Sequence, residues 1–386
     1  MQLPDPATMI GGLEQAGANV VLAATGGGAR AIAHLVSTPG ASSVVLEGLV
    51  PYARQAIDRL LGGPQESYCS SRTARRLAVV AWQRARDLGA DADAAVGAAV
   101  TASLRTREPK RGAHRLFVAL QTLRATASAE LVLEKGARSR DEEESLAAAV
   151  LLAELSAATG LPATVVPTAD LRGAEQVVRD RCAPPQSWQD LFAGKRTATR
   201  AEEPSEEPAA RVGRLIFPGS FDPLHEGHLL MARIAEEIAE RPVEYELSIT
   251  NVDKPALDYL EIRDRAAQFA DRPLWLSRAA RFLEKLEAFP GSTFVMGADT
   301  YVRLADPRYY GGSAAAAADA ARTIATRAGG LIVFGRSKGD VFLEPAHLDV
   351  PQVLRDVTYF VSQREFRLDV SSTELRRRQL EATCDT

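Results

Sequence analysis

The fold of the second half of the chain is decided by the segment Arg214-Leu-Ile-Phe-Pro-Gly-Ser-Phe-Asp-Pro-Leu-His-Glu-Gly-His228. Its first four residues are predicted to form a strand, a glycine-containing turn follows, and residues 229–239 have the apolar spacing of a helix. The unpaired N–H groups at such a helix N-terminus form a site for phosphate. Gly219 allows a close backbone approach, and His225 and His228, three residues apart, can face the same anion.

The histidine pair could also serve in a metal site or in a purely structural turn. Spacing by three residues occurs in metal sites, but neither a cysteine nor a paired third ligand accompanies it here. Phosphate chemistry is favoured over both alternatives because two of the five histidines lie beside two glycines, Gly219 and Gly227, at the start of a helix. No protein-ligated metal site is predicted.

A second candidate anion site lies near the end of the chain, in Val370-Ser-Ser-Thr-Glu-Leu-Arg376. Three hydroxyl residues can cap a helix there and offer hydroxyl and N–H groups to an anion, namely Ser371, Ser372 and Thr373. Arg376 follows on the same face and can add a charge-assisted hydrogen bond. A plain capping box at the same position is the alternative, and the two are compatible.

These two segments resemble the HxGH and ISSTxxR signatures of the adenylyltransferase and cytidylyltransferase superfamily of nucleotidyltransferases. Phe294-Val-Met-Gly-Ala-Asp-Thr300 resembles the Gly-x-Asp strand-loop of nicotinamide and nicotinate mononucleotide adenylyltransferases. The resemblance covers most of residues 214–378. It implies a Rossmann-like domain with a parallel sheet, and an enzyme of the EC 2.7.7 class.

The resemblance implies that AMP passes from ATP to a mononucleotide, first of all nicotinamide mononucleotide, giving NAD and pyrophosphate. Mg²⁺ would arrive with ATP, and no covalent enzyme intermediate would form. Four residues would carry the catalysis: His225, His228, Lys254 and Arg376. The nucleotides would be bound by Gly219, Ser220, Phe221, Gly227, Gly297, Asp299, Ser371, Ser372 and Thr373. Lys254 could instead be an exposed loop lysine, and Asp299 an acidic cap. A different phosphate acceptor, CTP as donor, or a non-catalytic nucleotide sensor are the alternative functions.

The first half alternates predicted strands and helices, which favours an α/β layer structure. A strand over residues 20–23 leads into Thr25-Gly-Gly-Gly28. Gly26-x-Gly28-x-x-Ala31, with Glu47 about 20 residues on, loosely fits a dinucleotide-binding fingerprint.

The better match is to the nicotinamide-nucleotide amidase domain at the C-terminus of the competence-damage protein CinA. The stretches that carry it include Thr25-Gly-Gly27, Gly48-Leu-Val-Pro-Tyr52 and Ala98-Ala-Val-Thr101. The serine and cysteine of that family's first motif are Ala23 and Ala24 here, and its lysine falls near Ile57. Alanine has no hydroxyl to attack an amide. The resemblance therefore implies a non-catalytic remnant that binds a nucleotide or has a regulatory role, with a pocket at Thr25, Gly26, Gly27 and Thr101.

Composition and length limit the number of domains that the chain can form. The 386 residues, 46% hydrophobic and 25% charged, suffice for two folded domains. A Glu- and Pro-rich break suggests three parts: 1–160, a connecting segment 161–213, and 214–386. A fragment that begins near Arg211 is predicted to keep the transferase activity.

A net charge of −4 gives no reason to expect a nucleic-acid partner, and no apolar run is long enough for a membrane span. The chain is expected to be cytoplasmic, with ATP and a mononucleotide as partners; homo-oligomerisation is left open.

Overall fold

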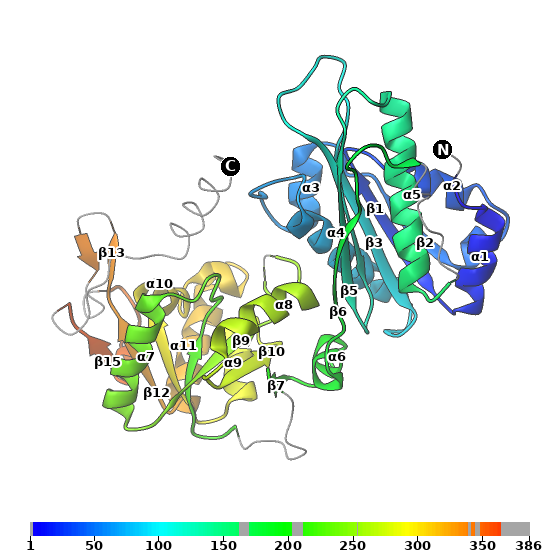
Figure 1. Cartoon of the computed structure of the whole chain (residues 1–386). Coiled ribbons are helices and arrows are strands. Elements are labelled where there is room, and N and C mark those ends of the chain that lie inside the picture. Colours follow the sequence, from blue (N-terminus) through cyan, green and yellow to red (C-terminus); the bar gives the residue numbers. More distant parts are fainter. Residues whose placement is uncertain are drawn as a thin grey trace. The chain divides into compact units, whose positions relative to one another are not determined.

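The computed structural model describes residues 3–161, 170–202, 211–252, 254–338, 341–343 and 348–363. The chain forms two compact units, each built on one sheet (Figure 1). The first unit comprises Met1–Gln189 and Asp253–Arg263, and the second comprises Asp190–Val252 and Asp264–Thr386. The prediction of two α/β domains, the second with a parallel sheet, is confirmed.

The first unit has a six-stranded mixed sheet in the order β2-β1-β3-β4-β5-β6. β1 pairs in parallel with β2 and β3, and the remaining pairs are antiparallel. The strands are β1 (Asn19–Thr25), β2 (Val45–Leu49), β3 (Ala95–Ser103), β4 (His114–Gln121), β5 (Thr126–Leu133) and β6 (Val178–Cys182).

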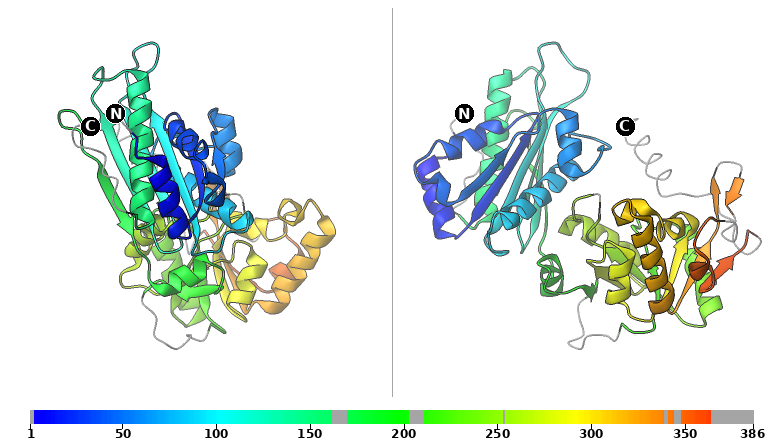
Figure 2. Two further views of the ribbon diagram at one scale, coloured as in Figure 1. Left: turned by 90° about the vertical axis from the view of Figure 1, so that its right-hand side faces the viewer. Right: turned by 180° about the vertical axis from the view of Figure 1, so that it is seen from behind.

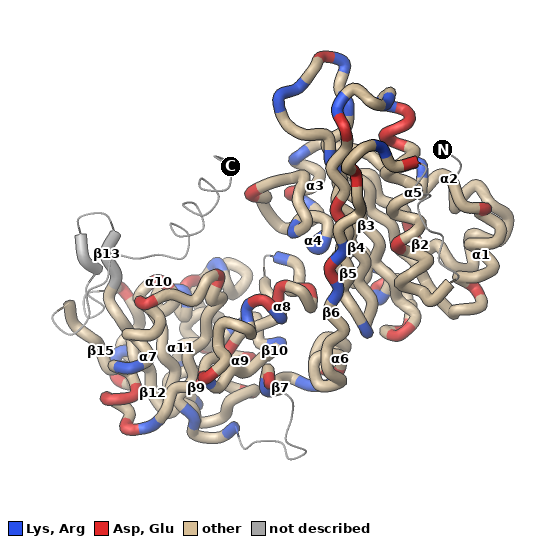
Figure 3. Tube along the Cα trace, in the orientation of Figure 1, with Lys and Arg blue, Asp and Glu red and all other residues tan. Residues whose placement is uncertain are grey.

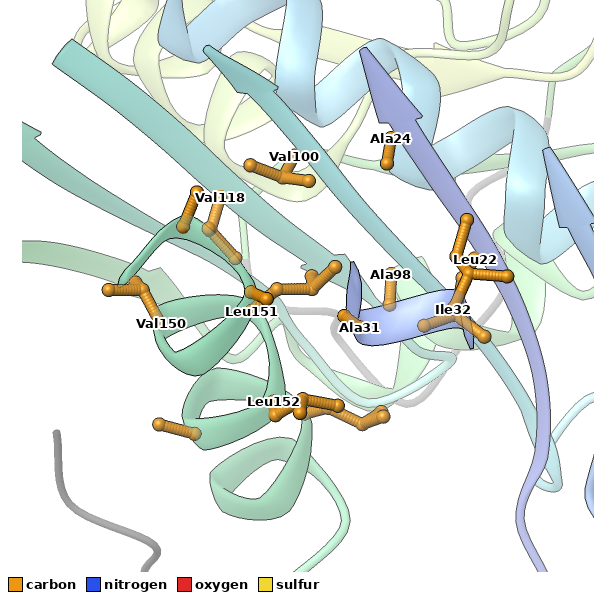
Figure 4. Close-up of a cluster of buried hydrophobic side chains, with 14 of the residues drawn as sticks. Leu22, Ala24, Ala31, Ile32, Ala98, Val100, Val118, Val150, Leu151 and Leu152 are labelled. Atoms are coloured by element: carbon orange, nitrogen blue, oxygen red, sulfur yellow. The ribbon is translucent and has the colours of Figure 1, made fainter. Parts of the chain in front are cut away.

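Helices cover both faces of this sheet (Figure 2). They are α1 (Pro6–Gln15), α2 (Ala29–Val36), α3 (Arg54–Leu61), α4 (Ser71–Asp87) and α5 (Arg140–Ala158). Successive strand residues point to opposite faces. Leu22 and Ala24 therefore pack in the cluster that contains Ile32 of α2 and Leu151 of α5 (Figure 4), whereas Ala23 packs with residues of α3 and α4.

The second unit has a seven-stranded sheet in the order β15-β12-β11-β8-β9-β10-β7. All neighbouring strands are parallel except the edge strand β7. Their bounds are β7 (Ala198–Arg200), β8 (Leu215–Pro218), β9 (Val243–Ser248), β10 (Leu274–Ser277), β11 (Thr293–Gly297), β12 (Gly330–Phe334) and β15 (Thr358–Val361). The chain winds from β8 outward to β10, then returns to the other side of β8 at β11. The strand order therefore reverses between β8 and β11, where open α/β sheets bind ligands.

The remaining helices have 4–14 residues. They are α6 (Gln186–Phe192), α7 (Glu226–Ala239), α8 (Tyr259–Ala266), α9 (Phe282–Ala288), α10 (Ala298–Arg303), α11 (Ala314–Arg327) and α12 (Gln352–Arg355), and β13 (Arg336–Lys338) pairs with β14 (Val341–Leu343). The core contains a paired carboxylate: fully buried Glu246 accepts from Lys285 Nζ at 2.7 Å. Within the described residues, no helix has the length and apolar character needed to cross a membrane.

Candidate functional site

Two turns, each joining a strand to a helix, lie at the carboxyl edge of the second sheet, next to the point where the strand order reverses. The loop of residues 219–225, called here the phosphate loop, joins β8 to α7. Gly297 ends the neighbouring β11 and is the N-cap of α10, with Asp299 in that helix's first turn. Because β8 and β11 are adjacent and parallel, both turns lie at the same edge of the sheet. This places the expected HxGH and Gly-x-Asp segments on neighbouring strands.

The phosphate loop owes its shape to a buried phenylalanine. Phe221 is fully buried and has a φ of +43°, in the left-handed region that bulky residues rarely adopt. A Cβ on Gly219 would lie 2.5–2.9 Å from atoms of the Phe221 ring, so only glycine fits there. The ring packs edge-on against those of Phe217, His228, Tyr245 and Phe269, with centroids 5.1–5.6 Å away. Phe221 therefore offers only its backbone to a ligand.

The two histidines stack on each other at the start of α7. Their ring centroids are 3.8 Å apart with 24° between the planes, and His225 is the N-cap residue. The backbone N–H of His225 donates to Nδ1 of His228 at 3.3 Å. A neutral His228 whose Nδ1 accepts carries its proton on Nε2. Its Nε2–H can therefore donate to a phosphate oxygen.

Both rings are neutral at physiological pH. Burial lowers the pKa of His228 from 6.5 to about 3, with a smaller contribution from the neighbouring His225. Burial also lowers the pKa of His225. Nδ1 of His225 is buried and makes no hydrogen bond within the part of the chain described. The pair thus supplies polar, uncharged groups to the site, and cationic charge has to come from elsewhere.

Two side chains that the sequence analysis did not identify support the phosphate loop. Arg265 Nη1 donates to the Ser220 carbonyl at 2.8 Å, and its Nη2 lies 3.4 Å from Asp222 Oδ2. Gln268 Oε1 accepts from the Leu224 N–H at 2.8 Å. Both residues are more than 35 positions beyond the loop. No local pattern marks them, and only their proximity to a motif in three dimensions reveals their role.

The other expected site residues are distributed as follows. Ser220 and Asp299 are exposed, and Gly227 is buried in the first turn of α7. Lys254 is exposed and belongs to the segment that the structure assigns to the first unit. Four of the expected residues lie outside the described residues: Ser371, Ser372, Thr373 and Arg376. Within the described residues, no group of three or more His, Cys, Asp or Glu side chains could hold a metal ion.

The HxGH turn at the sheet reversal agrees with the comparison of the sequence with known families. Residues 216–378 match the cytidylyltransferase-like family. The matched stretch contains the phosphate loop and the second expected signature at residues 370–376. This half of the chain is therefore a nucleotidyltransferase-like domain, for which nucleotidyl transfer is the indicated type of activity. The comparison with curated proteins found no match to this sequence.

Solved structures of competence-damage proteins are similar to part of the chain. A competence or damage-inducible protein from Enterobacter asburiae is 19% identical over 40% of this chain and 95% of its own, with a TM-score of 0.35. A CinA superfamily protein from Escherichia coli is 21% identical over 40% and 92%, with a TM-score of 0.33. The protein CihA from Agrobacterium tumefaciens is 21% identical over 42% and 99%, with a TM-score of 0.32.

In the first unit, the hydroxyls of the expected nucleotide pocket are bonded within the chain. Thr25 is buried, and its Oγ1 donates to the Pro51 carbonyl at 2.8 Å. Thr101 is also buried, and its Oγ1 donates to the Tyr68 carbonyl at 2.6 Å. Both threonines thus hold loops against the ends of β1 and β3.

The glycines of the same pocket permit close backbone packing. A Cβ on Gly26 would lie 1.9 Å from the Ala102 carbonyl oxygen, and one on Gly27 would lie 2.5 Å from Leu104. The N-terminus of α2 faces a carboxylate of the chain itself, because the Arg30 N–H donates to Glu144 Oε1 at 3.2 Å. An incoming phosphate would have to compete with this carboxylate.

Ala23 and Ile57, which the sequence resemblance would place at the amidase nucleophile and lysine, are apolar and buried. Both belong to one cluster between β1, α3 and α4. Glu47, which a dinucleotide-binding role would place on a ribose, forms two hydrogen bonds with Arg84 at 2.5 and 2.6 Å. These contacts give the residues a structural role without any ligand.

Proposed function

We propose that the second unit transfers AMP from ATP to nicotinamide mononucleotide, giving NAD and pyrophosphate. The observation that carries the proposal is the stacked pair His225 and His228 at the N-terminus of α7, beside the sheet reversal. The family match at residues 216–378 supports nucleotidyl transfer, and the Gly-x-Asp turn at Gly297 supports the pyridine mononucleotide as acceptor.

In this proposal, an oxygen of the mononucleotide 5′-phosphate attacks the α-phosphorus of ATP. A bond forms between them while the bond to the bridging oxygen breaks, and pyrophosphate leaves. His228 Nε2–H donates to the α-phosphate, and the amides at the start of α7 bind the same anion. Since both histidines are neutral, the growing charge is balanced by Mg²⁺ brought with ATP and by Arg376. Mg²⁺ dehydrates reluctantly, so phosphate oxygens and water would be its main ligands.

Pyrophosphate release tests the proposal. The purified chain is incubated with Mg²⁺, either ATP or CTP, and a panel of acceptors that includes nicotinamide and nicotinate mononucleotides. Pyrophosphate that depends on ATP and nicotinamide mononucleotide supports it, and release with CTP or another acceptor would replace the substrate assignment. No release with any pair would favour a nucleotide sensor. Arg322→Ala, which removes an exposed arginine from α11, is the matched control for variants of the site.

For the first unit, we propose a non-catalytic nucleotide-binding or regulatory role. The apolar surroundings of Ala23 support this, because a nucleophile needs a hydroxyl or thiol and a nearby base. The full chain, given nicotinamide mononucleotide without ATP, is expected to release no ammonia while still binding the nucleotide. The full chain is used because residues 253–263 are part of this unit. Ammonia release that Thr25→Ala abolishes would make Thr25 a replacement nucleophile and overturn the assignment.

A further inference from the structure

A glutamine side chain bridges the two ends of a turn inside the phosphate loop. The turn comprises residues 221–224. The Leu224 N–H donates to Gln268 Oε1 at 2.8 Å, and Gln268 Nε2 donates to the Phe221 carbonyl at 3.2 Å. In many four-residue turns, the carbonyl of the first residue and the N–H of the fourth are joined directly. Here the amide of Gln268 joins them, so the shape of the turn depends on this side chain.

The chemistry of these contacts selects an amide. A carbonyl partner needs a donor and an N–H partner needs an acceptor, and a glutamine side chain supplies both. Gln268 Nε2 donates a second time, to the Arg265 carbonyl at 3.3 Å, which fixes the orientation of the amide. A glutamate of the same shape would keep only the acceptor for Leu224, and a leucine would keep neither group. The two functions of the side chain can therefore be separated by substitution.

Gln268 is held in place by its neighbours in the second unit. It belongs to η3 (Ala267–Phe269), the 3₁₀ turn that follows α8. The next residue, Phe269, is buried, and the centroid of its ring lies 5.1 Å from that of Phe221 and 5.0 Å from that of Tyr245. The bridging amide and the phenylalanine of the loop are therefore anchored to one aromatic cluster. Every one of these residues lies in the second unit.

An arginine three residues earlier binds the beginning of the loop. Charged residues recur along α8 (Figure 3), and Arg265 near its C-terminal end is only 8% exposed. Its Nη1 donates to the Ser220 carbonyl at 2.8 Å, and its Nη2 lies 3.4 Å from Oδ2 of Asp222, the single charged residue of the loop. Arg265 and Gln268 thus bind backbone groups at positions 220, 221 and 224.

The bridged turn leads directly into the histidine pair. Leu224 precedes His225, which is the N-cap of α7, and His228 follows in the first turn of that helix. The direction in which the chain enters α7 therefore depends on where the Leu224 N–H is held. A shift there would move the His225 N–H away from His228 Nδ1, to which it donates at 3.3 Å.

We propose that Gln268 is a positioning residue for nucleotidyl transfer: its amide holds residues 221–224 and, through Leu224, fixes the two histidines in their reactive arrangement. Gln268 itself does not contact the substrate. This inference rests on the proposed function of the second unit. A misplacement of about 1 Å at a reacting centre lowers the rate about 10²-fold, so a side chain outside the site can control kcat.

The test uses the full chain and two independent readouts. Gln268→Leu removes both polar groups, and Gln268→Glu keeps the acceptor for the Leu224 N–H. Gln352→Leu is the matched control, because it removes an exposed amide of the same unit that donates to Asp356 at 2.7 Å. Hydrogen exchange of the Leu224 amide, resolved by NMR and compared with exchange in β11, reports the order of the turn without any substrate. Pyrophosphate release gives kcat and the KM for ATP.

The Leu224 amide is expected to exchange about fivefold faster in Gln268→Leu, as for the loss of one hydrogen bond, while exchange in β11 is unchanged. It should keep its wild-type rate in Gln268→Glu and in Gln352→Leu. The kcat should fall about tenfold in Gln268→Leu, with the KM for ATP within about twofold, and Gln268→Glu should recover part of this loss.

Three outcomes would overturn the inference. The first is unchanged Leu224 exchange in a folded Gln268→Leu variant. The second is a Gln268→Glu variant that protects Leu224 but loses as much kcat as Gln268→Leu. The third is a rise in the KM for ATP at unchanged kcat, which would mean that Gln268 binds the nucleotide directly. If the wild type releases no pyrophosphate, the proposed function fails, but the exchange experiment still decides whether Gln268 holds the turn.

Discussion

Replacing His228 with glutamine should remove a pH dependence from the stability of the second unit. The unfolded chain binds a proton at this histidine with an ordinary pKa of 6.5, whereas the folded ring has a pKa of about 3. Between these values the unfolded state holds more protons, so stability falls as the pH falls. From pH 7.5 to pH 5, this one group lowers the free energy of unfolding by about 2 kcal/mol. Glutamine does not titrate in this range.

Hydrogen exchange of the central strand β11 (Thr293–Gly297) measures this effect inside the second unit alone. The ratio of exchange rates between His228→Gln and wild type is determined at each pH, which cancels the intrinsic pH dependence of exchange. We expect this ratio to change about 30-fold between pH 7.5 and pH 5, with wild type relatively less protected at pH 5. A change below about threefold would show that the His228 ring is solvated and titrates normally, which contradicts the half-buried, stacked geometry.

Further outcomes follow from the same contacts. His228→Ala should lower the rate of pyrophosphate release about 10²–10³-fold, and His228→Gln should retain more activity because its amide still donates. Gly219→Ala should lower the free energy of unfolding by about 1–3 kcal/mol, seen as a lower denaturation midpoint, because the new methyl group meets the Phe221 ring. A double variant with Phe221→Leu should lose less than the sum of the two single changes. Ala23→Ser should produce no ammonia from nicotinamide mononucleotide, since the cluster around it holds no base.

Local patterns were sufficient to predict the framework of the site. The apolar run before Gly219 is β8, and the helix expected after it is α7. Each of these follows from periodicity or propensity within about fifteen residues. The turn residues of the HxGH segment also predicted that the two histidines lie at the N-terminus of a helix.

Partner choice across the chain was not predictable in this way. The burial of Tyr259 beside Thr126 joins residues 133 positions apart, and nothing in the sequence around either residue specifies the other. The contact of Glu144 with the start of α2 is similar: the sequence offers the helix N-terminus to any anion, and the fold supplies a carboxylate. In the sequence, Arg265 is likewise an ordinary charged residue on a short amphipathic helix. Only the structure shows that it contacts the phosphate loop.

Residues 253–263 belong to the first unit although they follow part of the second in the sequence. This affects when each unit can complete its folding during synthesis. The ribosome completes Gln189 well before Arg263, and the 74 residues between them take about 4–15 s at roughly 5–20 residues per second. During this interval the surface that receives Tyr259, formed by α4 and the turn between β4 and β5, has no occupant from its own chain. The N-terminal unit therefore begins folding first but finishes only after the first strands of its successor have been made. Slower translation of residues 190–263 would prolong this incomplete state.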